Sequence, residues 1–308
     1  MIPFKHRCAL GSAGLQANDY VSCGFDQADV IICVGYDLVE YHPYLWHPSR
    51  DRCIVHIDHS PAETDGHYPV AVGVVGDIKH SLDRIAGLTT PHQGAHVRPL
   101  RERLVEEMDQ HRDDLEFPVK PQKIIWDLRT ALDLEDIVVC DVGAHKMWMA
   151  RMFRCEHPNT CIISNGFASM GIAVPGAIAA KLVYPQRHVV AVTGDAGFMM
   201  NSQEIETAIR CKLPIVILIW NDSSYGLIEW KQMNQFQRIS NVRFENPDFV
   251  AYAESFGARG YRVERTADLP AILKAALAND TVSIIDCPVD YRENIKLTDQ
   301  LGTLVCPT

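Results

Sequence analysis

Short apolar runs rich in Val and Ile alternate with amphipathic stretches along residues 121–308. The strand-like runs cover residues 136–141, 188–193, 215–220 and 282–286, and the helix-like stretches cover residues 123–132, 171–182, 202–211, 249–256 and 269–278. β-Branched strands that alternate with helices predict an α/β fold with a doubly wound parallel sheet. Ligands of such sheets bind at the carboxyl ends of the strands, so we expect the chemistry at Asp141, Asp195 and Asn221.

Residues 1–88 show a shorter version of the same pattern. Three apolar runs, at residues 29–35, 53–58 and 70–75, precede a helix-like stretch at residues 78–85. Continuous Val/Ile runs of this kind predict a parallel sheet that is covered on both faces. A segment of this length is enough only for a partial Rossmann-like α/β domain.

Residues 89–120 differ from the regions on either side. A polar, turn-rich segment is followed by a charged amphipathic stretch at residues 100–111 and by a Pro-containing segment at residues 117–122. This composition predicts a linker with one helix. The sequence therefore predicts a partial central domain at 1–88, a linker at 89–120 and a second α/β domain at 121–308.

Composition narrows the classes of function. The chain has 308 residues, 29 Lys and Arg against 39 Asp and Glu, and a net charge of −10, which disfavours a nucleic-acid partner. The densest apolar run, at residues 215–220, is far shorter than the roughly 20 residues of a membrane-spanning helix. The N-terminus does not resemble a signal peptide, and none of the 10 cysteines forms a C-x-x-C pair. We therefore expect reduced thiols and a cytoplasmic protein without a membrane partner.

The most informative segment follows the run at residues 188–193. Gly194, Asp195, Ala196 and Gly197 lie between this strand and a predicted helix. Small residues at a helix N-terminus let backbone amides approach an anion such as a diphosphate. A bare carboxylate beside a phosphate is repulsive, and a divalent cation between the two removes the conflict.

A second strand, at residues 215–220, ends in Asn221 and Asp222, so its oxygen ligands fall at the same edge of the sheet as Asp195. Taken alone, Asp195 is equally consistent with a helix cap, and residues 221–222 with a turn. Together, at this spacing, they favour a diphosphate–Mg²⁺ site.

These segments resemble a known family. The pattern Gly-Asp-x-Gly-x-x-x-Asn at residues 194–201, followed by Asn221-Asp222, resembles the thiamine-diphosphate motif, although Ala196 stands where that motif usually has Gly. Residues 141–153, 164–182, 223–232, 251–264 and 287–297 are similar to segments of the acetolactate synthase group, most of all its catabolic branch. The resemblance implies a thiamine-diphosphate-binding fold for residues 121–308.

The resemblance also implies roles for individual residues. Magnesium is expected at the side chains of Asp195 and Asp222 and the carbonyl of Ser224, with Asn221 replacing Asp222 if the register shifts by one. The residues expected around the diphosphate are Ala196, Gly197, Tyr225, Gly226 and Leu227 on one side and Gly143, Ala144 and His145 on the other.

The remaining implied roles concern the aminopyrimidine and the substrate. The carbonyl of Ala168 is expected to bind the aminopyrimidine, and Met170 to hold the cofactor in its bent, V-shaped conformation. Trp230 and Lys231 are expected in the substrate pocket. Alternatives remain open from the residues alone, since Met170 and Trp230 also suit core packing and His145 also suits the surface.

The implied activity is that of a carboligase. Such an enzyme, a transferase, decarboxylates pyruvate on thiamine diphosphate and adds the two-carbon unit to a second 2-keto acid, in branched-chain amino acid or acetoin metabolism. The family's activating glutamate lies on a pyrimidine-binding domain that residues 1–120 do not resemble, so a longer chain or a partner must supply it. A homodimer or tetramer is expected, and FAD binding is left open.

Two alternatives accompany this interpretation. One is another thiamine-diphosphate-dependent decarboxylase or lyase that differs only in its pocket residues. The other is a truncated cofactor-binding module without turnover.

Overall fold

The computed structural model describes residues 2–13, 20–38, 41–90 and 97–297. The chain divides into two compact units, a larger one of Met1–His6 with Glu107–Lys296 and a smaller one that includes Arg7–Glu106. The division falls inside helix α3 (Val97–Asp109), within the predicted linker, of which residues 91–96 lie outside the described residues. The domain limits at 88/89 and 120/121 stay a prediction.

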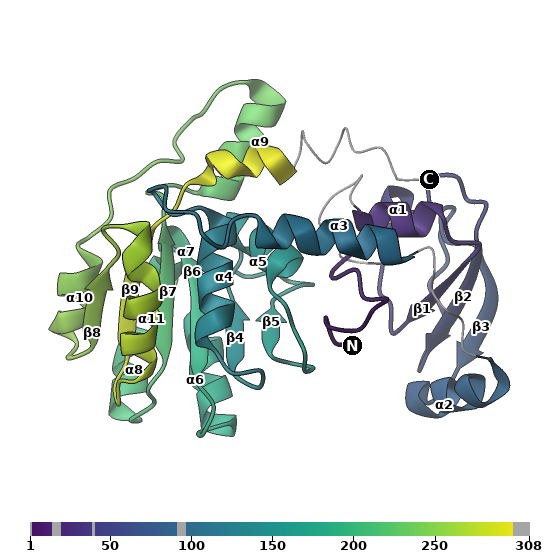
Figure 1. The fold of residues 1–308 in the computed structure, drawn as a ribbon, viewed down its shortest axis with the longest axis horizontal. Coiled ribbons are helices and arrows are strands. Elements are labelled where there is room, and N and C mark those ends of the chain that lie inside the picture. The colour runs from purple at the N-terminus through teal and green to yellow at the C-terminus, as the bar shows by residue number, and fades with distance from the viewer. Residues whose placement is uncertain (1, 14–19, 39–40, 91–96, 298–308) are drawn as a thin grey trace. The chain divides into compact units, whose positions relative to one another are not determined.

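The larger unit is built on a six-stranded sheet in the order β5-β4-β6-β7-β9-β8, in which every neighbouring pair is parallel (Figure 1). This confirms the predicted doubly wound fold. The strands are β4 (Ile137–Cys140), β5 (Cys161–Ile163), β6 (Val189–Gly194), β7 (Val216–Asn221), β8 (Arg259–Arg262) and β9 (Ser283–Pro288).

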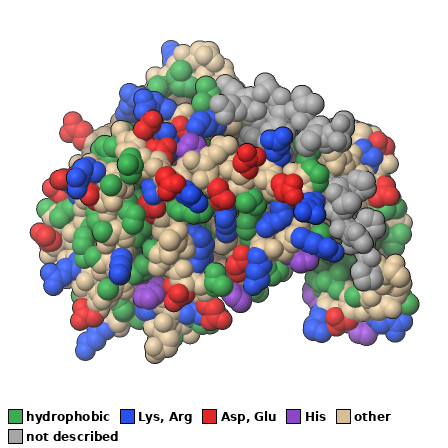
Figure 2. Space-filling model, viewed as in Figure 1, with side chains coloured by type: hydrophobic (Ala, Val, Ile, Leu, Met, Phe, Trp, Pro, Cys, Tyr) green, Lys and Arg blue, Asp and Glu red, His purple; other side chains and the backbone are tan. Residues whose placement is uncertain are grey.

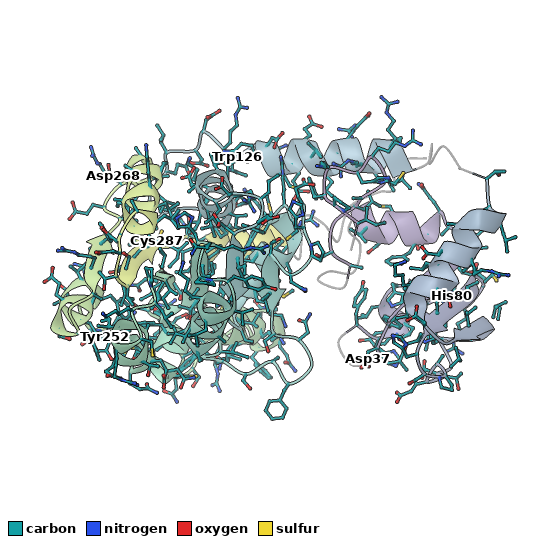
Figure 3. All side chains as sticks on the ribbon, turned by 90° about the horizontal axis from the view of Figure 1, so that it is seen from below. Asp37, His80, Trp126, Tyr252, Asp268 and Cys287 are labelled. Carbon is teal, nitrogen blue, oxygen red and sulfur yellow. The ribbon has the colours of Figure 1, made fainter. Side chains whose placement is uncertain are left out.

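Helices cover both faces of this sheet. One face packs against α6 (Ala173–Val183), α8 (Glu204–Arg210) and α10 (Phe249–Ser255), whose apolar residues share one core cluster with alternate residues of the strands. The other layer contains α4 (Pro121–Ala131), α5 (Ala144–Met152) and α11 (Leu269–Leu277). Cys287 of β9 lies amid the side chains of this unit, whereas Asp268 lies at its margin (Figure 3).

Two further helices lie at the carboxyl ends of the central strands. α7 (Asp195–Met200) begins at the residue after β6, and α9 (Gly226–Phe236) begins shortly after β7. The helix predicted at residues 202–211 corresponds to α8, and α7 precedes it as a separate short helix. α7 and α9 bring their first residues to the same edge of the sheet.

The smaller unit contains a three-stranded parallel sheet in the order β1-β2-β3. Its elements are α1 (Tyr20–Asp26), β1 (Val30–Val34), a 3₁₀ turn at Pro43–Leu45, β2 (Cys53–Asp58), β3 (Val70–Val75) and α2 (Ile78–Leu88). The parallel pairing is as predicted. The prediction that both faces are covered is wrong for the described residues, because Val30, Ile32 and Val34 are 44%, 56% and 42% exposed.

An aromatic cluster explains why only one face of that sheet is buried. Trp46 and Tyr68 pack on Ile31 and Ile54, and β-strand side chains alternate between faces, so the residues between them point away from the cluster. Over the face shown in Figure 2, acidic and basic side chains are interspersed. No helix among the described residues is long and apolar enough to cross a membrane.

The cysteines depart from expectation at one position. Eight described cysteines are free thiols, as predicted, but Cys23, which is almost fully buried, is bonded in a disulfide. The expectation of a fully reduced set is therefore wrong at Cys23. The sequence could not show this, because no short C-x-x-C spacing marks the position.

Candidate active site

A cavity of about 130 Å³ lies at the carboxyl ends of β4, β6 and β7. Most of the residues singled out from the sequence line it, although they come from four separate segments. The lining residues are Val142, Gly143, Ala144, His145, Met170, Gly194, Asp195, Ala196, Gly197, Asp222, Ser224, Tyr225, Gly226, Leu227, Ile228 and Tyr291.

Asp195 is the buried acidic residue at the centre of this arrangement. Its Oδ1 accepts a hydrogen bond from the Ala196 amide at 2.8 Å, and its Oδ2 accepts from the Ser223 amide and from Asn246 Nδ2, each at 2.7 Å. Burial nevertheless raises the pKa of Asp195. The carboxylate is therefore held in one orientation but remains costly to ionise.

Asp222 also lines the cavity, and its Oδ2 accepts a hydrogen bond from Ser224 Oγ at 2.9 Å. Burial and the nearby charge of Asp195 raise the pKa of Asp222 to about 7. In the described part of the chain, no Lys or Arg forms an ion pair with either carboxylate. A buried and a half-buried carboxylate that repel one another form a donor set suited to a divalent cation.

The loop that follows Asp222 is strained at one residue. Ser223 has φ +54°, in the left-handed region that non-glycine residues rarely adopt. The Phe244 amide donates to the Ser223 carbonyl at 3.1 Å, and the Tyr225 amide donates to the Val242 carbonyl at 2.9 Å. These contacts hold the loop in a conformation that it would not adopt by itself.

Glycines give the cavity its small, close walls. A Cβ on Gly226 would lie 2.7 Å from Asp222 Oδ2, one on Gly143 would lie 2.8 Å from the His145 ring, and one on Gly197 would lie 3.1 Å from Thr193 Oγ1. α9 begins at Gly226, and its Ile228 and Glu229 amides already donate to the Tyr225 carbonyl, which leaves the Gly226 and Leu227 amides of the first turn without an intrahelical acceptor. At the glycine positions the walls present backbone to an occupant, as an anion site requires.

His145 and Tyr291 bring unsatisfied polar atoms to the cavity. The His145 ring is 2% exposed and hydrogen-bonds to the Asp141 backbone, while its Nε2 has no partner among the described residues. Burial lowers the pKa of His145 to about 4, so the ring is neutral at pH 7. The Tyr291 hydroxyl is likewise buried without a described partner, and burial raises its pKa.

Met170 is held beside the cavity by two neighbours of Gly171. Asp141 Oδ1 accepts from the Gly171 amide at 2.8 Å, and Asn201 Nδ2 donates to the Gly171 carbonyl at 2.9 Å. Gly171 has φ +85°. Asp141 is thus a structural residue rather than part of the chemistry, a correction to the expectation from its place at a strand end.

Several predicted residues do not line the cavity. Asn221 turns its amide to Asp286 Oδ1 at 2.8 Å, so Asp222 and not Asn221 faces the site. Ala168 lies near Met170 in sequence with φ +50°, another left-handed residue. Trp230 and Lys231 lie on α9, and Lys231 is exposed.

Tyr291 and Asn246 are site residues that the sequence did not indicate. Tyr291 lies in a 3₁₀ turn after β9, and Asn246 lies in a loop without any motif. The one available signal for Tyr291 was its place shortly after a strand end.

The metal donor set is small. Among the described residues, no group of three or more His, Cys, Asp and Glu side chains could hold a metal ion. Magnesium is commonly bound by one or two carboxylates, with water and phosphate oxygens completing its shell. Two carboxylates and a carbonyl beside a cradle of glycines therefore fit Mg²⁺ together with a diphosphate.

Comparison with known proteins agrees with this geometry. Residues 141–287 match the thiamine pyrophosphate enzyme, C-terminal TPP binding domain, and residues 1–85 match the thiamine pyrophosphate enzyme, central domain. The chain belongs to the thiamine pyrophosphate enzyme family. The matched C-terminal domain contains all the lining residues except Tyr291.

The relatives of this thiamine pyrophosphate enzyme chain include acetolactate synthases. It is 39% identical to acetolactate synthase of Bacillus subtilis over 93% of this chain and 51% of that protein. It is 37% identical to catabolic acetolactate synthase of Raoultella terrigena over 94% and 53% of the two chains. It is 31% identical to a probable acetolactate synthase large subunit of Methanocaldococcus jannaschii over 98% and 53%. The chain spans about half the length of these relatives.

Proposed function

We propose that this chain supplies the Mg²⁺- and diphosphate-binding half of an acetolactate-synthase-like active site. The enzyme decarboxylates pyruvate and joins the two-carbon unit to a second 2-keto acid. The observation that carries the proposal is a pair of mutually repelling carboxylates, the buried Asp195 and the half-buried Asp222, beside a glycine cradle and without a described cationic partner. The names of the relatives support the choice of reaction.

In this proposal, Asp195, Asp222 and the Ser224 carbonyl hold Mg²⁺. The strained conformation of Ser223 between them supports this role, because such strain concentrates at functional sites. The cation offsets the repulsion between the two carboxylates and lets the diphosphate approach them.

The diphosphate would contact backbone on both sides of the cavity. Residues expected on one side are Ala196, Gly197, Tyr225, Gly226 and Leu227, and those on the other are Gly143, Ala144 and His145. The Tyr225 amide donates to the Val242 carbonyl, so the Gly226 and Leu227 amides are the better donors on that side. Tyr291, with its buried hydroxyl, is added to this set.

Met170 and Ala168 orient the organic part of the cofactor. Thiamine diphosphate, when bound, supplies a nucleophilic carbon and accepts the electron pair left by decarboxylation. Met170, whose neighbour Gly171 is fixed by Asp141 and Asn201, would support the bent cofactor, and Ala168, which has φ +50°, would offer its carbonyl to the aminopyrimidine. Both residues act by positioning.

The activating glutamate and the complete substrate pocket require a domain other than the two described above. The glutamate that activates the aminopyrimidine is expected on a pyrimidine-binding domain, in a cytoplasmic homodimer or tetramer. Trp230 and Lys231 of α9 are proposed to line the substrate pocket when that domain is present.

An assay of acetolactate formation tests the proposal. Pyruvate, thiamine diphosphate and Mg²⁺ are supplied to the chain alone and to the chain mixed with a pyrimidine-binding domain of the family. We expect acetolactate from the mixture and none from the same mixture with Asp222→Asn. Acetaldehyde without acetolactate would instead assign a simple decarboxylase, and tight cofactor binding without turnover in either sample would assign a binding module.

A further inference from the structure

Two free cysteines meet at the edge of the large sheet. Cys155 lies in the loop between α5 and β5, Cys161 is the first residue of β5, and both are half-buried. The Cys161 thiol donates a hydrogen bond to Cys155 Sγ, and the Cys155 thiol donates to the Phe153 carbonyl at 3.8 Å. They are separated by five residues in the sequence, which form a tight loop.

The backbone holds this pair together. Asn159 has φ +61°, and Thr160 Oγ1 donates to the His157 carbonyl at 2.8 Å, which closes the loop. The Val138 amide donates to the Thr160 carbonyl at 2.9 Å and fixes the start of β5 to β4. On the other side, the Phe4 amide donates to the Cys155 carbonyl at 2.8 Å. The contact between the sulfurs is thus a product of the fold.

A half-buried arginine, Arg129, lies beside the two thiols. Arg129 Nη2 donates to the Leu132 carbonyl at 2.8 Å, and its Cζ lies 5.1 Å from the centre of the Phe153 ring. Its Nη1 is buried and has no hydrogen-bond partner among the described residues. A fixed positive charge next to a thiol favours the thiolate, the form that reacts with oxidants.

The two thiols have different acidities. Hydrogen bonds from Cys161 and Thr160, together with the charge of Arg129, lower the pKa of Cys155. The pKa of Cys161 is raised by its hydrogen bond to Cys155 and by burial. Cys155 is therefore the nucleophile of the pair, and Cys161 keeps its proton until a second step.

A cavity lies beside the loop that carries this pair. It has a volume of about 290 Å³ and is lined by Arg129 and by Arg154 and Glu156, the two sequence neighbours of Cys155. Four of the other described cysteines lack this combination. Cys140 and Cys287 are fully buried, and Cys53 and Cys211 are exposed without a neighbouring thiol partner in the described structure.

We propose that Cys155 and Cys161 form a reversible disulfide, which makes this loop a redox-modification site. With a hydroperoxide as oxidant, the Cys155 thiolate attacks one oxygen, so that an S–O bond forms and the O–O bond breaks. The released hydroxide takes up the proton that Cys155 had lost. Cys161 then attacks the Cys155 sulfur, an S–S bond forms, and the hydroxyl group leaves as water with the proton of Cys161.

The balance of this reaction is complete. Two thiols lose two electrons, and hydrogen peroxide is reduced to two molecules of water. A dithiol reductant reverses the modification by exchange through Cys155 or Cys161. The proposal is independent of the function proposed above, because none of its residues lines the Asp195–Asp222 cavity.

Mass spectrometry of the whole chain tests the proposal. After brief treatment with hydrogen peroxide, we expect the loss of two hydrogen atoms, a 155–161 cross-link in a non-reducing digest and full reversal by dithiothreitol. In Cys161→Ser, a sulfenic acid should accumulate at Cys155 and be trapped by dimedone. Cys211→Ser is the matched control and should still form the cross-link.

A measurement on the unsubstituted chain covers the case in which a variant fails to fold. Iodoacetamide should alkylate Cys155 about tenfold faster than the exposed Cys211 at pH 7, because only Cys155 has thiolate-stabilising neighbours. Equal alkylation rates, or a disulfide that joins Cys155 to a different cysteine, would overturn the proposal.

Discussion

The backbone amide of Ser223 donates a hydrogen bond of 2.7 Å to Oδ2 of Asp195. This contact joins the segment after β7 to the first residue after β6. It helps to fix the Asp195 carboxylate, which accepts three hydrogen bonds in all. The Asp222 carboxylate accepts a side-chain hydrogen bond from Ser224 Oγ and has no comparable set of donors among the described residues. The two acidic residues therefore contribute differently to the stability of the metal-free fold.

We expect Asp222→Asn to stabilise the metal-free chain by about 1–2 kcal/mol, because it removes a partly desolvated charge that Asp195 repels. Asp195→Asn should destabilise it by about 1–3 kcal/mol, because Asp195 accepts three hydrogen bonds. Urea unfolding at pH 8 with EDTA measures both. Destabilisation of similar size in the two variants would contradict the difference that we describe.

The pH dependence of stability follows from the raised pKa of Asp222. A carboxyl group that has a folded pKa of about 7 and an ordinary unfolded pKa binds more protons in the folded state between these values. Its contribution to stability is present at low pH and is lost as pH rises through about 7. The stability gap between Asp222→Asn and the parent should therefore widen from pH 5.5 to pH 8.

Thermal unfolding of both proteins in EDTA over this pH range makes the measurement. Subtracting the unfolding free energy of the parent from that of Asp222→Asn removes the contribution of groups that titrate alike in both proteins. A gap that stays constant with pH would mean that Asp222 is ionised throughout.

Gly171 should be intolerant of a side chain. Its φ is +85°, and a Cβ there would lie 2.8 Å from Asn201 Nδ2, so Gly171→Ala combines backbone strain with a clash. Gly166→Ala is the matched control, because Gly166 has φ +69° and nothing within 4 Å of its Cβ position. We expect Gly171→Ala to lose at least about 1 kcal/mol more in denaturant unfolding. Equal losses would show that the Asn201 contact is not rigid.

Removal of the Tyr291 hydroxyl should leave the metal-free fold unharmed. That hydroxyl is buried and has no partner among the described residues, so Tyr291→Phe is expected to be neutral or stabilising by up to about 1 kcal/mol. Tyr261→Phe is the control, because the Tyr261 hydroxyl accepts from Asn279 Nδ2 at 2.7 Å and its loss should destabilise. If Tyr291→Phe is the more damaging change in thermal unfolding, the hydroxyl has a structural partner.

The sequence predicted the central strands well and the edges poorly. β6 and β7 were placed to within a residue because fully buried strands are continuous apolar runs. β5 has three residues and β8 has the sequence Arg-Gly-Tyr-Arg, so neither carries a strand pattern. Edge strands need less apolar sequence because they are buried less.

The candidate site was predictable where it depends on strand ends. The sequence predicted that Asp195 and Asp222 lie at one edge of the sheet, because the carboxyl ends of parallel strands meet at the same edge. The role of Asp141 could not be predicted, because its carboxylate accepts hydrogen bonds from the Gly171 and Ala173 amides, and the sequence does not show that these distant residues lie beside it. The place of Tyr291 in the cavity was not predicted for the same reason. The exposed face of the β1-β2-β3 sheet was not predicted, because the periodicity of a strand cannot show whether a helix covers it.

Calorimetric titration with thiamine diphosphate tests the central claim most directly. The account predicts binding that requires both Mg²⁺ and the diphosphate, so unphosphorylated thiamine should not bind measurably. Asp222→Asn should weaken the Mg²⁺-dependent binding at least about tenfold while the variant stays folded. Equal affinity for thiamine and thiamine diphosphate, or binding that is unchanged by EDTA, would contradict the assignment of this cavity as a Mg²⁺–diphosphate site.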